Sequence, residues 1–586
     1  MTGAGRNPQP ARWNAYNQRV VHTLFSRRLW RVGLFVAHAG LGLAFALSAA
    51  VPACGQAAAG SGFGPAEDRG RILLVLPFDN RTGQPSLEWI REAAPEILSS
   101  RFASAGFAPM SRADRMYALD HLGLPEGFHP SRASSLKLAE TLDADSIVVG
   151  SYITDGAGIV AEARLVDVPH LRMSQAVTAH GAMRDLISVF DSLAWKLTRE
   201  LDPKFSGSEE TFVAAGAGLR LDAFEQYIRG ITEPDQAERL RHLKNAVVES
   251  PEFSQAWMAL GREDYNGQQY EEAAAAFAKV GRNDPDALEA GFYRGLSLLF
   301  SGDYPRAEEA FGGVARVLPL AEVVNNEGVA VSREGRDGSQ LFRQAVAADP
   351  NTADYHFNLA VSLNRQGVAA EALTELAQCL RLRPNDSEAL GLEKAWSEPS
   401  AQRSAGPKAS VRPVSNLSPG NEPAGEPKAD PLERIARSFD AAAFHQAAMM
   451  MDQMEASRLA VLTPRQRALK LSVQAKDYLD RGLLLEAERL YLSAVAADGK
   501  VAEAHAGMAQ VRELAGDSAA ARKEAVTSLE LIPTSDAYLV LGRLDLAAGH
   551  LGEANHEANE ALKLAPQSQA AQQLRRQVDE KKAQKK

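Results

Sequence analysis

The sequence predicts a multidomain protein in which an α/β sandwich precedes two all-α solenoid arrays. Short apolar runs that alternate with amphipathic stretches predict the sandwich in the first third of the chain. Prolines that recur about every 34 residues, most with an apolar residue eight positions before them, predict stacked helix pairs in the remainder. A proline-rich stretch divides this helical part into two arrays.

Residues 1–53 have the layout of a signal peptide or a membrane anchor. Six arginines and no acidic residue precede an apolar stretch from Val32 to Ala53. Small residues favour cleavage before Cys54, which resembles the lipid-modified cysteine of bacterial lipoproteins and is the candidate for lipidation. The apolar stretch is 22 residues long, so it could instead span a bilayer uncleaved. Residues 54–70 are glycine-rich and are expected to form a flexible spacer.

Residues 71–203 are predicted to form the α/β domain. The apolar run from Arg71 to Asn80 predicts a buried strand, and the run at 145–152 predicts another, with helices between them. Turn residues at 155–158 lead into an alternating stretch, which predicts a hairpin. An amphipathic helix at 186–201 completes the domain.

The motifs of this domain resemble those of the amino-terminal domain of the TolB protein. The order is L-P-F-x-N in the opening strand, then A-D-x-x-V-x-G-S, then a hairpin that ends in A-x-L-V-D. These patterns occupy residues 76–80, 144–151 and 163–167. Such domains are similar to non-catalytic assembly modules of bacterial envelope proteins. The resemblance therefore implies an assembly role and no active site.

Residues 219–396 are predicted to form the first array, with five units and a cap. The repeated prolines, 34, 34, 31 and 34 residues apart, are Pro251, Pro285, Pro319, Pro350 and Pro384. A small residue and a bulky one recur at fixed offsets before most of them, which favours close packing of two helices. Gly302 and Gly367 mark the turn between the helices of a unit. The pattern resembles the tetratricopeptide repeat family.

Three further segments complete the organisation. The stretch 397–430 contains six prolines and no aromatic residue, so it is predicted to be a disordered linker. Residues 431–464 are predicted to form another helix pair. Residues 465–586 are predicted to form a second tetratricopeptide array of three weaker units and a C-terminal cap helix.

Composition and missing motifs exclude several functional classes. The net charge is −10, whereas broad binding to nucleic acid needs clustered cations, so no nucleic-acid partner is predicted. The two cysteines, Cys54 and Cys379, cannot form a disulfide framework. No nucleophile elbow, kinase motif or paired-cysteine metal motif occurs. We therefore predict no catalytic residue, no cofactor and no metal.

The tetratricopeptide resemblance implies a groove on the concave face of the first array, where a peptide or a partner helix would dock. Apolar anchors flanked by arginine and asparagine suit such a partner. The predicted groove residues are Met258, Arg262, Tyr265, Glu289, Phe292, Asn325, Arg333, Phe357, Asn364 and Arg365.

Together these features predict a non-catalytic scaffold that binds protein partners and is exported to the bacterial periplasm or cell envelope. Cys54 is the candidate lipid anchor to the outer membrane. The first alternative is an uncleaved signalling or regulatory protein anchored in the inner membrane. The second is an enzyme with an unrecognised site in the α/β domain, which would require a polar pocket at the strand ends.

Overall fold

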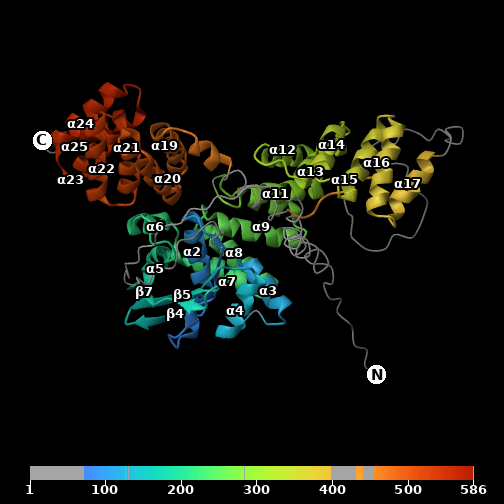
Figure 1. Ribbon diagram of the computed structural model, residues 1–586, viewed down its shortest axis with the longest axis horizontal. Helices are drawn as coiled ribbons and strands as arrows, with labels where there is room; N and C mark the ends of the chain where they lie inside the picture. The colour runs from blue at the N-terminus through green and yellow to red at the C-terminus, as the bar shows by residue number, and fades with distance from the viewer. Residues whose placement is uncertain are drawn as a thin grey trace, which may run out of the picture. The chain divides into compact units, whose positions relative to one another are not determined.

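The computed structural model describes residues 72–125, 127–129, 131–282, 284–397, 431–439 and 454–584 (Figure 1). The predicted export signal, Cys54, the spacer and residues 398–430 of the predicted linker lie outside the described residues. Within the described ranges, no helix has the length and apolar character needed to cross a membrane.

A mixed sheet lies at the centre of the N-terminal domain. Its strands are β1 (Ile72–Val75), β2 (Asp79–Asn80), β3 (Ala108–Pro109), β4 (Ser146–Asp155), β5 (Gly158–Asp167), β6 (Arg172–Met173) and β7 (Val177–Ala182). β1 lies between β3 and β4 and is parallel to both, and β2 is also parallel to β4. β4 and β5 form the long hairpin that the turn residues at 155–158 predict. β6 and β7 each pair antiparallel with β5.

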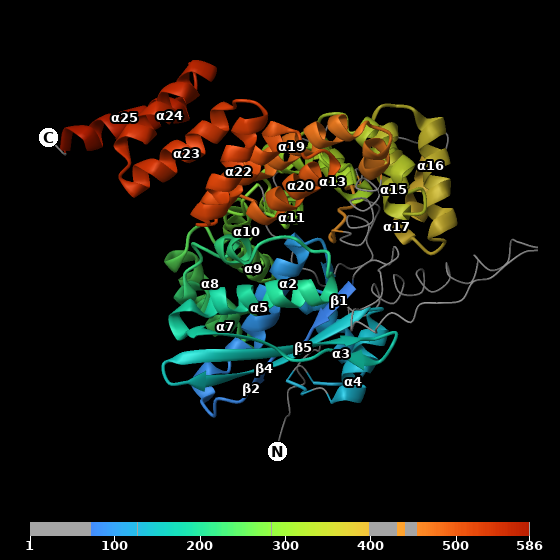
Figure 2. The same cartoon turned by 60° about the vertical axis from the view of Figure 1, so that its left-hand side comes forward.

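Helices cover both faces of this sheet (Figure 2). They are α2 (Ile90–Ser104) and α5 (Leu186–Leu201) on one face, and α3 (Arg112–His121) and α4 (Arg132–Thr141) on the other. Successive strand residues point to opposite faces. Leu73 and Val75 therefore pack with α2 and α5, whereas Leu74 and Leu76 pack with α3 and α4.

The first array consists of five helix pairs and a final helix. They follow the short α6 (Glu209–Ala215) and are α7 (Leu221–Thr232), α8 (Gln236–Glu249), α9 (Ser254–Asn266), α10 (Tyr270–Phe277), α11 (Ala287–Ser301), α12 (Tyr304–Ala315), α13 (Ala321–Arg333), α14 (Ser339–Ala348), α15 (Ala353–Arg365), α16 (Ala369–Leu382) and α17 (Ser387–Ser397). Phe224, Ile228 and Leu243 of the first pair belong to the same apolar core as α2 and α5. The first pair thus continues the core of the N-terminal domain.

Within a pair, a phenylalanine of the second helix packs where the first helix carries glycine. A Cβ on Gly295 would lie 2.7 Å from the ring of Phe311, and a Cβ on Gly328 would lie 2.8 Å from the ring of Phe342. Both rings are fully buried. The missing side chain therefore creates the space that the bulky repeat residue fills.

The second array repeats this plan in a weaker form. Its helices are α19 (Pro464–Asp480), α20 (Leu484–Ala497), α21 (Ala502–Leu514), α22 (Ser518–Leu531), α23 (Ser535–Ala548), α24 (Leu551–Leu564) and α25 (Gln569–Gln584). Gly516 and Gly549 adopt φ values of 82° and 81° between paired helices, as Gly302 and Gly367 do in the first array at 83° and 80°. Glycine favours this left-handed conformation because it has no Cβ.

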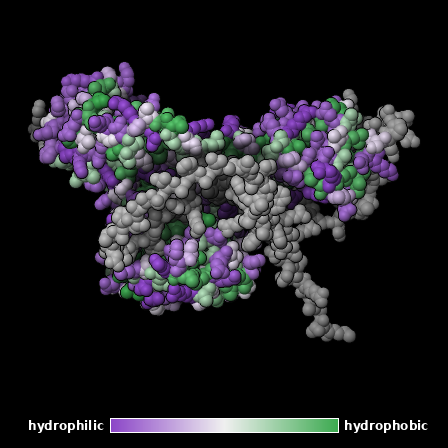
Figure 3. All heavy atoms as spheres, in the orientation of Figure 1, coloured by the Kyte–Doolittle hydropathy of each residue, from purple (hydrophilic) through white to green (hydrophobic). Residues whose placement is uncertain are grey.

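Large apolar side chains reach the surface in both arrays, and Val248, Val317 and Leu514 are examples. Leu469 and Val473 lie one helical turn apart on α19. On the described surface visible in Figure 3, hydrophilic residues predominate and apolar ones lie among them. Exposed apolar residues of this kind are ordinary for a protein surface.

Candidate functional site

A segment from beyond the predicted linker occupies the groove of the first array. We call residues 431–439 the groove segment; it is shown in orange between two grey stretches in Figure 1. The sequence predicts a helix pair over 431–464, but the groove segment contains no helix and lies along α13 and α15. Its backbone groups bond to side chains of these helices, which replaces the hydrogen bonds that a helix would form within itself. Residues 440–453 of the predicted pair lie outside the described residues.

Asparagines of α13 and α15 bind the backbone of the groove segment. The Asn358 amide nitrogen donates to the carbonyl oxygen of Arg434 at 2.7 Å, and its oxygen accepts from the Arg434 backbone nitrogen at 2.6 Å. Asn326 binds Ala436 in the same way, at 2.7 and 2.9 Å. Asn325 donates to the Arg434 carbonyl at 3.1 Å. All three asparagines are fully buried, so their amides are held in place and act like a neighbouring β-strand.

Glu433 enters a cationic site between α13 and α15. Its side chain is 1% exposed, and one carboxylate oxygen lies 3.1 Å from Nε of Arg333. The other oxygen accepts hydrogen bonds from Arg365 and Ser332. Arg365 also donates to the carbonyl oxygen of Pro431 at 2.8 Å. Two guanidinium groups thus compensate one buried carboxylate, a requirement for burying such a charge.

Arg434 enters an acidic site on the opposite side of the segment. Its guanidinium lies 2.9 Å from Asp354, 2.6 Å from Asp386 and 3.1 Å from Glu388. It also stacks over the ring of Phe357, with 3.6 Å between the guanidinium carbon and the ring centroid. Burial acts to lower the pKa of Arg434, but hydrogen bonds to Asp386 and Asp354 outweigh it and raise this pKa. Arg434 is therefore fixed as a cation.

The far end of the groove segment rests on aromatic residues of α11. The rings of Phe439 and Phe292 are 5.5 Å apart, and Ile435 packs against the same apolar core. Arg437 lies over Phe300, with 5.7 Å between its guanidinium carbon and the ring centroid. The groove therefore changes from charged and polar at α13 and α15 to aromatic at α11.

The structure brings half of the predicted groove residues to the groove segment. Asn325, Phe292, Arg333, Phe357 and Arg365 contact it directly. Whether they also bind a partner remains a prediction.

The other predicted residues lie elsewhere. Met258 is 2% exposed and packs with Phe277, so it belongs to the core between helices. Arg262 and Glu289 pair with each other at 2.7 Å, and Tyr265 packs among aromatic neighbours. Asn364 is half-buried, and no hydrogen bond from its side chain is found to the described groove segment. The repeat phase thus located the groove, but it did not separate core from surface.

Sequence reasoning missed Asn326 and Asn358 of the groove, and Glu433 and Arg434 of the groove segment. The sequence did carry a signal for the asparagines. Each one follows or interrupts an apolar run within a helix, although asparagine is a weak helix former. Glu433 and Arg434 carried no such signal, since adjacent opposite charges are common on exposed surfaces.

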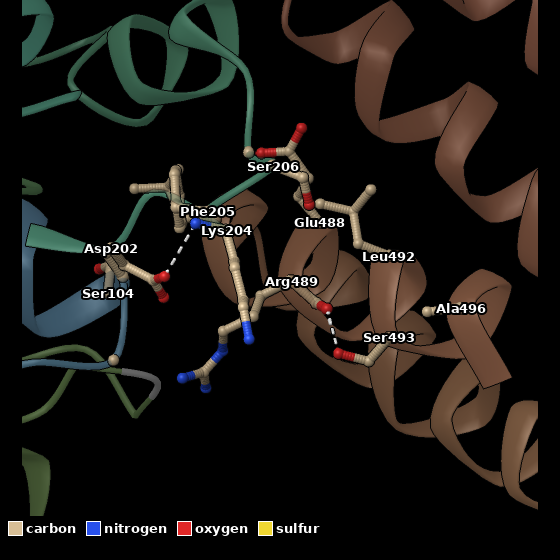
Figure 4. A pocket seen from close by; sticks show the side chains of 14 residues that line it. Ser104, Asp202, Lys204, Phe205, Ser206, Glu488, Arg489, Leu492, Ser493 and Ala496 are labelled. Carbon is tan, nitrogen blue, oxygen red and sulfur yellow. Dashed lines mark hydrogen bonds between the residues drawn. The ribbon is translucent and has the colours of Figure 1, made fainter. Parts of the chain in front are cut away.

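A separate hollow of about 370 Å³ is lined by residues 202–207 and by α20 (Figure 4). Two of its polar side chains have partners within it: the Asp202 carboxylate accepts from the Lys204 backbone at 3.0 Å, and the Ser493 hydroxyl donates to the Arg489 carbonyl at 2.9 Å. None of its lining residues belongs to a strand. Across the described residues, no group of three or more His, Cys, Asp or Glu side chains could hold a metal ion. The groove of the first array is therefore the candidate site.

Comparisons with known proteins identify the repeats. A tetratricopeptide repeat model matches residues 258–316, 332–387 and 473–536. No curated protein matches the chain.

Similar solved structures cover only parts of it. MamA from Desulfovibrio magneticus RS-1 is 22% identical over 29% of this chain and 100% of its own, with a TM-score of 0.27. YrrB, described as a tetratricopeptide protein with an unusual peptide-binding site, is 17% identical over 35% and 99%, with a TM-score of 0.27. The LpoB C-terminal domain from Salmonella enterica is 18% identical over 20% and 84%, with a TM-score of 0.17. From the family model, we conclude that this chain contains tetratricopeptide repeats in both helical arrays.

Proposed function

We propose that this protein is a non-catalytic scaffold that binds extended segments of partner proteins in the groove of its first array. The observation that carries the proposal is the asparagine pair. Asn326 and Asn358 each bind both backbone groups of one residue, and those two residues alternate along an extended chain. Backbone hydrogen bonds of this kind provide affinity for any extended peptide, and neighbouring side-chain sites provide specificity.

The chemistry of the groove supports binding rather than turnover. Arg333 and Arg365 are engaged with a carboxylate, and Asp354 and Asp386 are engaged with a guanidinium. Burial acts to raise the pKa of Asp386, but hydrogen bonds from Arg434 and from the Ala389 backbone, together with the charges of Arg434 and Arg383, outweigh this effect and lower the pKa. A carboxylate with a lowered pKa is a poor proton donor near neutral pH and a good partner for a cation.

We further propose that the N-terminal domain is a TolB-like assembly module. The residues that carry the resemblance hold one another in place. A Cβ on Gly150 would lie 2.2 Å from the ring of Phe78, so the glycine of one motif makes room for the phenylalanine of another. The Asp145 carboxylate accepts a hydrogen bond from the Ile72 backbone at 3.1 Å, which attaches β1 to the start of β4. The residues of these motifs therefore stabilise the sheet of this domain.

The proposal includes export to the cell envelope, with Cys54 as a lipid anchor. It rests on the arginine-rich start and the apolar stretch that precedes Cys54. Mass spectrometry of the mature N-terminus in wild type and in Cys54→Ser checks it. A lipid on Cys54 that the variant lacks supports the proposal, whereas an intact Met1 in the membrane fraction favours the inner-membrane alternative.

Partner binding is tested by site-specific photo-crosslinking in cells. A crosslinking amino acid in place of Phe300, whose ring lies against Arg437 of the groove segment, would lie in the groove. The same chain with Asn326→Ala and Asn358→Ala would lack the backbone contacts. We expect defined crosslinked partners that the double variant loses at least tenfold. Arg316, an exposed residue at the end of α12, provides a control crosslinking position. Equal yields from wild type and the double variant would contradict the proposed function.

A further inference from the structure

We infer that the groove segment is an internal ligand, and that a partner displacing it presents the same pair, a glutamate followed directly by an arginine, in an extended chain. The inference deepens the proposed function and rests on it. It names both the recognised chemistry and the competitor that regulates access to the groove.

Backbone contacts alone give no preference among partners. Asn326 and Asn358 bind main-chain groups of Ala436 and Arg434, which every residue except proline offers. The preference must therefore come from the side-chain sites on the two sides of the segment.

The cationic site selects a carboxylate. Without Glu433, Arg333 and Arg365 would both lose the buried carboxylate that lies between them. Removing one partner from a buried charged cluster is strongly unfavourable, more so than making the cluster is favourable. A neutral residue at this position of a partner would consequently bind far more weakly.

The acidic site selects arginine over lysine. Arg434 uses both terminal nitrogens, at 2.6 and 2.8 Å from the two oxygens of Asp386, and its plane lies on Phe357. A planar guanidinium makes such a two-pronged contact and stacks at the same time, whereas an ammonium group does not.

The order of the two residues is also fixed. Successive side chains of an extended chain point to opposite sides, so Glu433 and Arg434 meet sites of opposite charge. If the order were reversed, a carboxylate would face Asp354, Asp386 and Glu388, and a guanidinium would face Arg333 and Arg365. The groove therefore reads glutamate before arginine.

Covalent attachment makes the groove segment a strong competitor. A tethered ligand reaches an effective concentration on the order of millimolar, so one with an intrinsic Kd of about 10 µM lowers the apparent affinity of a free ligand by about 100-fold. The groove therefore opens only when a partner also binds elsewhere on the protein, or when the binding of the groove segment to the groove is weakened.

The test is fluorescence anisotropy with a labelled synthetic peptide of residues 431–439 and the full chain. We compare wild type, the segment variant Glu433→Ala with Arg434→Ala, and Ser438→Ala. Ser438 is the control because it is an exposed residue of the same segment. The segment variant leaves every groove residue intact. It should bind the peptide at least tenfold more tightly than wild type, and Ser438→Ala should stay within about threefold of wild type.

A second peptide, with Glu433→Arg and Arg434→Glu, tests the order. It should bind the segment variant at least tenfold more weakly than the native peptide. Equal binding of the native peptide to wild type and to the segment variant would overturn internal occupancy. Equal binding of both peptides, or no binding of the native one, would overturn the motif.

Light scattering of the same samples separates a third outcome. A wild-type dimer that the segment variant converts to monomers would show that a second copy supplies the segment, which would overturn occupancy within one chain. The peptide-binding results do not depend on cellular partners. The crosslinking experiment can therefore fail while the peptide experiment succeeds, and the peptide experiment can fail while the crosslinking succeeds.

Discussion

The two arrays share a repeat frame but differ in their grooves. His356 in the first array bonds to Glu375 at 2.6 Å and to the carbonyl of Pro350 at 3.1 Å. His505 in the second array bonds to Glu524 at 2.7 Å and to the carbonyl of Gly499 at 3.1 Å. The spacings along the chain are the same, so these histidines align the two arrays residue by residue.

This alignment shows what the second array lacks. At the positions of Phe357, Asn358 and Arg365, which bind the groove segment, the second array has Ala506, Gly507 and Leu514. The histidine contact occurs in both arrays. At the positions compared, residues that bind a backbone or a charge occur only in the first array. The frame therefore keeps the helices stacked, and substitutions on the groove side decide whether an extended chain can bind.

The largest expected effect comes from disrupting the packing between paired helices of the first array. Phe311→Ala removes a fully buried ring and should lower the free energy of unfolding of this array by about 3–5 kcal/mol. The second array carries the smaller Ala525 at the matching repeat position and should be unaffected. Hydrogen exchange measured by mass spectrometry reports both arrays in one sample.

The control for this change is Val317→Ala, because the Val317 side chain is 60% exposed. We expect it to alter exchange in neither array. A matching rise of exchange in the second array of Phe311→Ala would show that the arrays unfold together.

The next effect concerns the groove alone. Asn358→Ala removes both of its hydrogen bonds to the backbone of Arg434. The carbonyl oxygen keeps its bond from Asn325, whereas the backbone nitrogen is left unpaired, at a cost of about 1–3 kcal/mol. Exchange of the groove-segment amides should rise about tenfold to 100-fold, while exchange in the helix cores changes little. Asn364→Ala is the matched asparagine control. Unchanged exchange of the segment in Asn358→Ala would mean that this asparagine does not hold it.

A smaller effect concerns the frame of the second array and depends on pH. Both groups bonded to His505 are acceptors, so the ring donates from both nitrogens when it is charged. The hydrogen bond to Glu524 raises the pKa of His505 above 6.5. The extra stability is complete below pH 6.5 and is lost as pH rises through the higher pKa of the folded state. We expect it to be about 1 kcal/mol or less.

His505→Gln is the natural comparison, because Gln572 makes the same bond to the carbonyl of Pro566 at 3.1 Å in α25. The difference in amide protection of α21 between wild type and variant should shrink from pH 6 to pH 9. A difference that stays constant over this range would rule out titration of His505 as its source.

The smallest expected effect is that of Arg262→Ala. Arg262 pairs with Glu289 at 2.7 Å, but its side chain is 49% exposed, and pairs of this kind contribute about 0–1 kcal/mol. Exchange of the groove segment should stay within about twofold of wild type. A large increase would place Arg262 in the groove after all, as the sequence predicts.

The features that sequence predicted well are those that recur or alternate. Phe311 and Phe342 keep the same distance from the proline that ends their unit, and both are buried at the helix contact. Alternation likewise marks the hairpin of β4 and β5. In these cases each residue's neighbours in space are set by its neighbours along the chain.

The groove segment could not be predicted in this way. Its extended backbone is held by Asn326 and Asn358, which lie 110 and 76 residues before the residues they bind, and no local pattern specifies that contact. Met258 shows the converse limit. It occupies a groove position in the repeat phase, yet its long flexible side chain fills a gap in the core instead.

The position of the groove segment along the chain also sets an order in time. The first array ends with α17 at Ser397, and the groove segment begins at Pro431. At about 5–20 residues per second, a ribosome needs roughly 2–7 seconds to translate from one to the other. During every round of synthesis, the receptor surface is thus made before its own occupant, and a newborn chain offers an open groove that the finished molecule does not.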